Sequence, residues 1–268
     1  MILHKYNGCG NDFILMDYEE GIDYHQLASK WCGQDRFDTD GLIVVREQPL
    51  TMLYFNKDGS QAPMCGNGIR CFARHVWDKA MVETSPFDVH TLAGVISIEI
   101  LTEEPFYCTA QMGQPDYSTE KLAVNQTEPI VDQIVCIGQV DVQLTSLFMG
   151  TIHTVVFVED AKAQQMKALG EQICHHPLFS EKTNVNFVQR VNEQELIVRT
   201  YERGVGWTLA CGTGCCAAYV VARDHGYLAS AKTMIHLEQG ELMITGETQI
   251  QMTGPAVHEW SQKEMSYD

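Results

Sequence analysis

The hydrophobic and polar positions in the first half of the chain form short runs separated by turn residues. β-Branched and aromatic side chains predominate in three of these runs, and the last alternates with a period of two, which is typical of strands. Another run instead places Ile69, Phe72, Ala73, Val76 and Trp77 at helical spacing. The pattern therefore predicts strands at 41–46, 51–55 and 95–101 and a helix at 67–80.

The second half of the chain repeats this order of elements. Strands are predicted at 153–158, 185–190 and 195–201, then a helix of small residues at about 213–224, then strands at 241–245 and 248–253. This order favours two similar α/β domains with a soft boundary near 112–115. Because no low-complexity linker separates the two halves, we expect them to pack against each other.

A Cys-Gly-x-Gly loop opens the predicted helix in each half. The first loop is Met64-Cys65-Gly66-Asn67-Gly68, and the second is Ala210-Cys211-Gly212-Thr213-Gly214. The match is short, but both loops lie at the same point of a strand–loop–helix unit. Repeats of this kind set the architecture of a chain, so the matched loops strengthen the case for a duplicated domain.

The two Cys-Gly-x-Gly loops also have residues suited to binding an anion and to transferring a proton. Glycine-rich loops at helix starts attract anions, because the first backbone N–H groups and the helix dipole point at the ligand, and the same field favours a cysteine thiolate. Two facing loops would hold one carboxylate and place a sulfur on either side of the neighbouring carbon. One thiolate could then remove the α-proton of an amino acid while the opposite thiol delivers another. The loops alone leave open a second interpretation, in which both cysteines are structural.

Composition narrows the possible functions. The chain has 268 residues and a net charge of −17, which argues against binding nucleic acid or an anionic membrane surface. It shows neither the apolar segment of a secretory signal nor an apolar run long enough for a transmembrane helix, so we expect a cytoplasmic protein. Most of its ten cysteines should then be thiols, and without paired Cys-x2-Cys knuckles no metal site is expected. Cys71, Cys215 and Cys216 fall inside predicted helices and are expected to be core residues.

Six segments carry further motifs, among them Gly8-Cys9-Gly10-Asn11-Asp12-Phe13: 4–13, 55–60, 64–71, 183–185, 201–214 and 252–256. In content and in order, these motifs resemble those of the diaminopimelate epimerase family. The resemblance implies an α+β fold of two pseudo-symmetric domains, each a β-barrel-like sheet wrapped around a central helix, with the active site in the interdomain cleft. The implied domains are 1–112 with about 257–268, and 113–256.

The resemblance also implies a reaction and its residues. The reaction is epimerisation at an amino-acid α-carbon by an isomerase that uses no PLP or other cofactor, and the enzyme is expected to be a homodimer in lysine biosynthesis. The catalytic residues implied are Cys65 and Cys211 as the acid–base pair, assisted by His153 and Glu202. The substrate-binding residues implied are Asn11, Asn56, Gly66, Asn67, Thr151, Asn184, Arg203, Gly212 and Thr213. Arg203 suits a distal carboxylate, because its planar fork can bind one with two parallel hydrogen bonds.

The chain departs from the family pattern at four places. Thr151 replaces a substrate-contacting asparagine, Trp207 replaces a glutamate, and 36–41 and 238–240 each lack two or more family residues. These changes spare the cysteine loops but fall where they could shape the distal pocket. Diaminopimelate, in its LL and meso forms, is the predicted substrate. The alternatives are a racemase of another amino acid, such as histidine, and a non-catalytic amino-acid-binding protein on the same scaffold.

Overall fold

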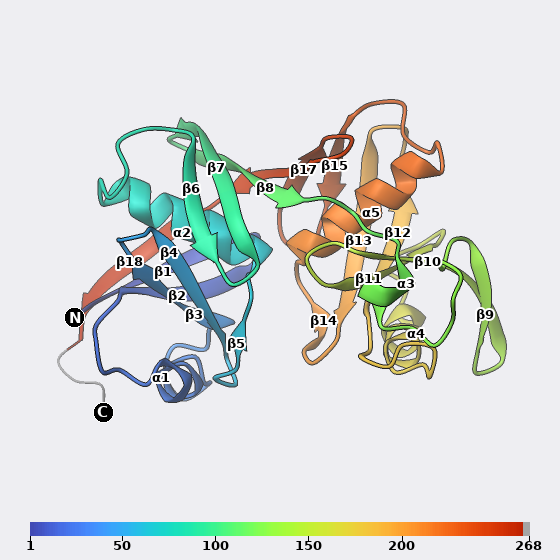
Figure 1. Cartoon of the computed structure of the whole chain (residues 1–268), viewed down its shortest axis with the longest axis horizontal. Coiled ribbons are helices and arrows are strands. Elements are labelled where there is room, and N and C mark those ends of the chain that lie inside the picture. Colours follow the sequence, from blue (N-terminus) through green and yellow to red (C-terminus); the bar gives the residue numbers. More distant parts are fainter. Residues whose placement is uncertain (265–268) are drawn as a thin grey trace. The chain divides into compact units, whose positions relative to one another are not determined.

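The computed structural model describes residues 1–264 (Figure 1). The described part of the chain divides into two compact units, the first formed by Met1–Gln111 and the residues from Thr253 on, and the second by Met112–Met252. Residues 265–268, which end the N-terminal domain implied by the resemblance, lie outside the described part. Strands predominate in both units and helices are few, so the fold is α+β. None of the helices in the described part is long and apolar enough to cross a membrane.

The first unit is built from strands at both ends of the chain. Its strands are β1 (Ile2–Gly8), β2 (Asn11–Asp17), β3 (Gly41–Arg46), β4 (Thr51–Asn56), β5 (Gln61–Ala62), β6 (Phe87–Thr91), β7 (Gly94–Glu103), β8 (Phe106–Gly113) and β18 (Val257–Lys263). Its helices are α1 (Tyr24–Trp31) and α2 (Gly66–Asp78). Strand β8, like β17 (Ile250–Pro255), runs across the limit between the two units.

The second unit is formed by the continuous middle of the chain. Its strands are β9 (Gln133–Ile137), β10 (Val140–Phe148), β11 (Ile152–Phe157), β12 (Asn184–Arg190), β13 (Glu195–Glu202), β14 (Gly206–Thr208), β15 (Lys232–His236) and β16 (Glu241–Thr245). Its helices are α3 (Thr119–Leu122), α4 (Gln165–Cys174) and α5 (Gly212–Asp224). All the predicted helices and strands are present, each within two residues of the predicted limits.

The two units repeat one ladder of strands. In the first unit β1–β2, β3–β4 and β6–β7 are antiparallel pairs, while β2–β3 and β4–β6 are parallel. In the second unit β10–β11, β12–β13 and β15–β16 are antiparallel, while β11–β12 and β13–β15 are parallel. Helices occur at the same points, since α1 and α4 precede β3 and β12, and α2 and α5 precede β6 and β15. The predicted pseudo-symmetry of the two halves is therefore confirmed.

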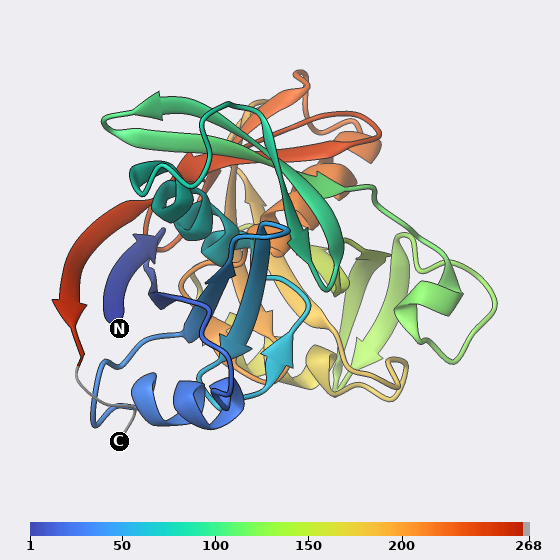
Figure 2. The ribbon, with the colours of Figure 1, turned by 60° about the vertical axis from the view of Figure 1, so that its left-hand side comes forward.

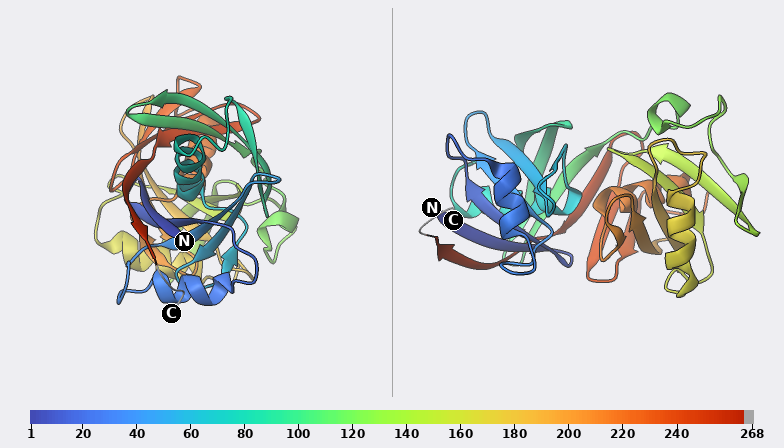
Figure 3. Two further views of the ribbon diagram at one scale, coloured as in Figure 1. Left: turned by 90° about the vertical axis from the view of Figure 1, so that its left-hand side faces the viewer. Right: turned by 90° about the horizontal axis from the view of Figure 1, so that it is seen from below.

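A central helix and an outer helix cover the two faces of each sheet. Helix α2 contacts β1 to β4 and β18, and strands surround it on several sides (Figure 2). Helix α5 contacts β10 to β13 and β16 in the same way. The outer helices, α1 on β3 and β4 and α4 on β12 and β13, pack on the opposite faces (Figure 3). Covering on both sides explains why five consecutive residues of β3 are buried, because a strand between two helices has no solvent-facing side.

A cluster of histidines is buried where β1 passes the C-terminal part of α2. The rings of His4 and His75 have centroids 4.8 Å apart, and the ring of His258 lies 6.0 Å from that of His4. His4 Nδ1 is 2.7 Å from the hydroxyl of Ser261. Burial, and then the electrostatic effect of the neighbouring His75, lower the pKa of His4 from 6.5 to about 4. His4 is therefore neutral in the folded protein at neutral pH.

We expect the protein to lose stability as the pH falls from 6.5 towards about 4, the unfolded and folded pKa values of His4. Over this range the unfolded chain takes up a proton at His4 that the folded chain does not, so falling pH favours unfolding. The contribution of His4 is at most about 3 kcal/mol, and urea unfolding at a series of pH values measures it. A His4→Gln variant should flatten the profile in this window, and an unchanged slope would contradict the assignment.

Candidate active site

In each unit the predicted site residues gather where two strands begin and a third ends. In the second unit His153 lies opposite Asn184 at the start of the parallel pair β11 and β12, and antiparallel β13 ends beside them at Glu202. In the first unit β2 begins at Asn11, and β4 ends at Asn56 beside the start of β3. Parallel strands start at the same edge of a sheet, which brings together side chains distant in the sequence.

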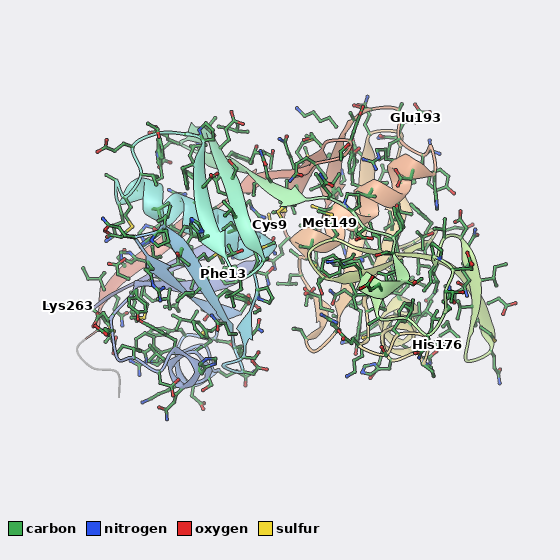
Figure 4. All side chains as sticks on the ribbon, in the orientation of Figure 1. Cys9, Phe13, Met149, His176, Glu193 and Lys263 are labelled. Atoms are coloured by element: carbon green, nitrogen blue, oxygen red, sulfur yellow. The ribbon has the colours of Figure 1, made fainter. Side chains whose placement is uncertain are left out.

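The turns that lead into these edges are also equivalent. Cys9 lies in the turn between β1 and β2, and Met149 lies in the turn between β10 and β11 (Figure 4). Cys9 adopts a left-handed backbone conformation with φ of 57°, as does Gly150, next to Met149, with φ of 75°. Each tight turn fixes the start of the strand that carries Asn11 or His153.

Cys65 is the N-cap of α2. Its backbone is extended, with φ −130° and ψ 121°, and its sulfur accepts a hydrogen bond of 3.4 Å from the Gly68 N–H. The side chain is partly exposed. The N–H groups at the start of a helix have no carbonyl acceptor within the helix, so the turn formed by Gly66 and Asn67 can bind an anion. The first half of the candidate site therefore combines a thiol with an anion-binding helix start.

The fully buried guanidinium of Arg70 supports this turn from within α2. It donates to the carbonyl oxygens of Gly66 at 3.0 Å and Pro255 at 3.1 Å, to Asn67 Oδ1 at 3.2 Å, and to Cys9 Sγ at 3.4 Å. The planar fork of a guanidinium can donate to several acceptors at once and fix their positions. Arg70 therefore shapes the first turn of α2 and adds a positive charge next to it. No role for Arg70 was predicted from the sequence, although it is a charged residue within an apolar helical pattern.

A row of oriented amides links Arg70 to the edge of the sheet. Because a guanidinium only donates, it fixes Asn67 Oδ1 as the acceptor, and Asn67 Nδ2 then donates to Asn11 Oδ1 at 2.6 Å. Asn11 in turn hydrogen-bonds the carboxyl of Asp40, which also accepts from the Asp12 N–H at 2.8 Å. Burial raises the pKa of Asp40. Two predicted binding residues, Asn11 and Asn67, are thus held in defined orientations.

Two polar side chains of segment 36–41, which departs from the family pattern, make ion pairs. Arg36 forms an ion pair with Glu264, and its guanidinium lies 5.5 Å from the ring centre of Trp31. Asp38 forms an ion pair of 2.6 Å with Lys57. The larger polar side chains of this segment therefore bond to α1, to the C-terminal segment and to the β4–β5 turn.

Cys211 caps α5 with nearly the same backbone as Cys65, φ −128° and ψ 107°. Its sulfur lies 3.6 Å from the Thr213 hydroxyl, but unlike the sulfur of Cys65 it makes no cap hydrogen bond with a backbone N–H of the helix. Unlike Cys65, it is buried, with 6% of its surface exposed. The two cysteine loops are therefore alike in geometry and different in their contact with solvent.

The surroundings of Cys211 favour its thiol form, against the thiolate that a helix start favours. Burial, followed by the negative charge of Glu202, raises the pKa of Cys211 well above its ordinary value. The nearby Thr213 hydroxyl and Gly214 N–H lower this pKa by less. Cys211 is therefore a thiol at neutral pH. Glu202 is held in turn by the Thr208 hydroxyl, which donates to its Oε1 at 2.9 Å.

His153 is fully buried at the start of β11. Burial, followed by the positive charge of Arg203, lowers its pKa from 6.5 to about 3, so the imidazole is neutral. Its Nδ1 lies 3.2 Å from Nδ2 of Asn186, on the neighbouring strand β12. Asn184 was predicted as a site residue from the sequence, but Asn186 was not. Its position could have indicated it, because residues two apart on a strand point to the same face as each other.

Arg203 is held from three sides. Its backbone N–H donates to Asn184 Oδ1 at 2.9 Å, and its guanidinium donates to the carbonyl oxygen of Glu181 and to the Thr151 hydroxyl, both at 3.0 Å. Thr151, one of the departures from the family pattern, therefore positions the guanidinium directly. About a third of the Arg203 side chain remains exposed, which leaves it accessible to a ligand.

Trp207, another departure from the pattern, faces away from the cysteine loop. Its ring packs 6.3 Å from that of Phe187 in the core cluster beneath α4. Successive residues of a strand point to opposite faces, so the next residue, Thr208, instead reaches Glu202. The suggestion that Trp207 shapes the distal pocket is therefore not supported, because the ring belongs to the core on the other face of the sheet.

The remaining cysteines show no further cluster of ligands. None of the ten cysteines, all in the described part of the chain, forms a disulfide, and Cys71, Cys215 and Cys216 are fully buried in their helices, as predicted. Among residues 1–264, no three histidine, cysteine or acidic side chains are grouped so that they could hold a metal ion.

Solved structures with this fold include racemases and epimerases. A probable proline racemase from Agrobacterium radiobacter superposes with a TM-score of 0.71 at 12% identity, over 98% of this chain and 92% of that chain. A hydroxyproline epimerase from Agrobacterium vitis gives a TM-score of 0.70 at 12% identity, over 98% of this chain and 91% of that chain. At this identity the likeness shows the fold alone, which this chain shares with both of these proteins.

Comparison of sequences gives the family. The family model described as diaminopimelate epimerase matches residues 3–118 and 145–259. The diaminopimelate epimerase of Desulfitobacterium hafniense is 39% identical over 96% of both chains, and that of Halothermothrix orenii is 39% identical over 94% of this chain and 93% of the other. The chain belongs to the diaminopimelate epimerase family and is an isomerase, as its motifs predicted.

Proposed function

We propose that the protein interconverts LL- and meso-diaminopimelate by two-base proton transfer between Cys65 and Cys211, without a cofactor. The observation that carries this proposal is the matched pair of cysteine caps. Each caps the central helix of its unit with the same loop and nearly the same backbone angles, at the same point of the repeated ladder. We take the two units as the two epimerase domains, with the substrate in a cleft between them and one sulfur on each side of its α-carbon.

The two cysteines would begin in different protonation states, as a two-base reaction requires. Cys211 is the proton donor, since burial and Glu202 keep it a thiol. Cys65 is the base, supported by the hydrogen bond from Gly68 and by the buried guanidinium of Arg70 in the same helix. Proton transfer inverts the carbon and exchanges the states of the two sulfurs.

The helix starts would bind the α-carboxylate. The N–H groups of Gly66 and Asn67 on one side and of Gly212 and Thr213 on the other are fixed dipoles, already oriented before the reaction. Such dipoles stabilise carbanion character at the neighbouring carbon without reorganising during the reaction. Glu202 would assist Cys211, whose pKa it raises, and His153 would assist Cys65.

The other predicted binding residues would select the substrate. Arg203, oriented by Thr151 and Asn184, would bind the distal carboxylate through its partly exposed guanidinium. Asn11 and Asn56 would bind the remaining polar groups. The relatives of 39% identity are diaminopimelate epimerases, which supports the same substrate here. With this substrate the enzyme would act in lysine biosynthesis, and we propose a cytoplasmic homodimer.

A substrate screen in deuterium oxide tests this function. The enzyme is incubated with meso-diaminopimelate, histidine, lysine or glutamate, and deuterium at the α-carbon is followed by mass spectrometry. We expect incorporation and inversion with diaminopimelate and at least about a hundredfold slower exchange with the other three amino acids. None of these three carries both a distal ammonium and a distal carboxylate, so polar groups of the binding site would be left unpaired. Exchange with histidine and none with diaminopimelate would replace the proposed substrate. No exchange with any amino acid would favour a binding protein.

A further inference from the structure

Asn186 has no role in the function proposed above, but its side-chain amide lies against the ring of His153. The side-chain nitrogen of Asn186 lies 3.2 Å from the carbonyl oxygen of Thr154 and 3.5 Å from that of Asn184. Its Oδ1 accepts from the Thr200 hydroxyl at 3.0 Å. Carbonyl oxygens only accept, so the amide orientation is determined by its neighbours, and Nδ2 must face them. The same Nδ2 faces Nδ1 of His153 at 3.2 Å.

We infer that Asn186 is a positioning residue that donates to Nδ1 of His153 and holds the ring as the tautomer with its proton on Nε2. A neutral imidazole has one N–H and one acceptor nitrogen, so a donor at Nδ1 places the proton on Nε2. The strongly lowered pKa of His153 supports this, because the ring is then neutral at working pH.

The other ring nitrogen of His153, Nε2, is buried without a hydrogen-bond partner among residues 1–264. A buried N–H without a partner costs about 1–3 kcal/mol, and such atoms are rare in folded proteins unless they serve a function. Combined with the tautomer, this makes Nε2–H a fixed donor, able to hydrogen-bond a sulfur or an anionic substrate.

Packing around Asn186 restricts it to this arrangement. A Cβ atom added to Gly214, in the first turn of α5, would lie 2.2 Å from Asn186 Oδ1. Glycine at this position is therefore required for Asn186 to reach His153. Asn186 thus links the start of α5, which carries Cys211, to the histidine on β11.

The catalytic part of this inference rests on the proposed function, whereas the tautomer does not, so the two are measured separately. Nitrogen-15 NMR of the wild-type imidazole rings reports the tautomer, with the His153 signals identified by their loss in His153→Gln. We expect a protonated Nε2 and an unprotonated, hydrogen-bonded Nδ1 that stay unchanged through neutral pH. A proton on Nδ1, or a doubly protonated ring at neutral pH, would overturn the inference even in a fully active enzyme.

Two variants of nearly unchanged shape test the role in the reaction. Asn186→Leu removes the donor, and we expect Nδ1 to become partly protonated and kcat to fall about tenfold, the loss of one hydrogen bond, with KM within about twofold. Thr200→Val removes only the partner of Asn186 Oδ1 and should leave the tautomer as in wild type. An Asn186→Leu enzyme with unchanged kcat would refute the positioning role. The two proposals can fail separately. If Cys65→Ala is inactive but the wild-type His153 ring carries its proton on Nδ1, this inference is refuted and the proposed function still holds.

Discussion

Replacing either Cys65 or Cys211 with alanine should abolish epimerisation, with a fall in kcat of at least about a thousandfold. Each sulfur would serve one face of the α-carbon, so inversion needs both, and general acid–base groups contribute factors of about 10² to 10⁴. Circular dichroism, coupled with an assay of the second stereoisomer, measures inversion in each variant from both directions.

The same two helices provide matched controls. Cys71 lies in α2 and Cys216 in α5, both fully buried, and neither belongs to the Cys-Gly-x-Gly loops. Cys71→Ala and Cys216→Ala should lower stability slightly and keep the turnover within a fewfold of wild type. If Cys65→Ala or Cys211→Ala retained full activity while folded, the two-base pairing would be wrong.

The second large effect is expected at Arg70. Arg70→Met should cost about 3 kcal/mol or more of unfolding free energy. It leaves three acceptors without this donor, the carbonyl oxygens of Gly66 and Pro255 and the Asn67 side chain, and each buried acceptor left unsatisfied costs about 1–3 kcal/mol. The first turn of α2 would then lose its orientation, so a protein that still folds should bind substrate and turn it over poorly. Urea unfolding and kcat/KM measure the two losses.

Arg74, one turn further along α2, is the control for this prediction. It donates to the Ala256 carbonyl at 2.8 Å and pairs with Asp78 and Glu104 at the surface. Arg74→Met should therefore cost about 1 kcal/mol, the worth of an ordinary hydrogen bond and a surface ion pair, and leave kcat/KM nearly unchanged. Equal losses in the two variants would show that Arg70 only stabilises the helix.

Helices and strands with a strong hydrophobic period could be predicted from the sequence alone. Strands β3 and β16 match their predicted limits, because turn residues follow their apolar runs. Helix α1 was not predicted, since it is only eight residues long and begins at a side-chain cap, in which Asp23 accepts from two backbone N–H groups. Strands such as β9 and β10 lack a long apolar run of their own and are defined by pairing with each other.

The cysteine loops could be found from the sequence because a repeat and a glycine pattern mark them. The residues that orient the site could not, since they act through contacts between distant segments. Asn186 meets His153 from a position 33 residues away, and Asn67 meets Asn11 from 56 residues away. The raised pKa of Cys211 is likewise a result of burial and of Glu202, which a pattern at the helix start does not reveal. The reaction predicted from the loops needs one thiolate and one thiol, and burial favours the thiol at Cys211.

The most direct test of proton transfer between two cysteines is the position of deuterium at low conversion in deuterium oxide. Starting from pure LL-diaminopimelate, two bases should place a solvent deuteron in nearly every molecule of inverted product from the first turnovers. The remaining substrate should stay largely unlabelled, because a sulfur exchanges its proton with solvent only after the substrate has been inverted or released. Inverted product that retains the substrate's own hydrogen would show that a single base serves both faces, and it would contradict a reaction shared by Cys65 and Cys211.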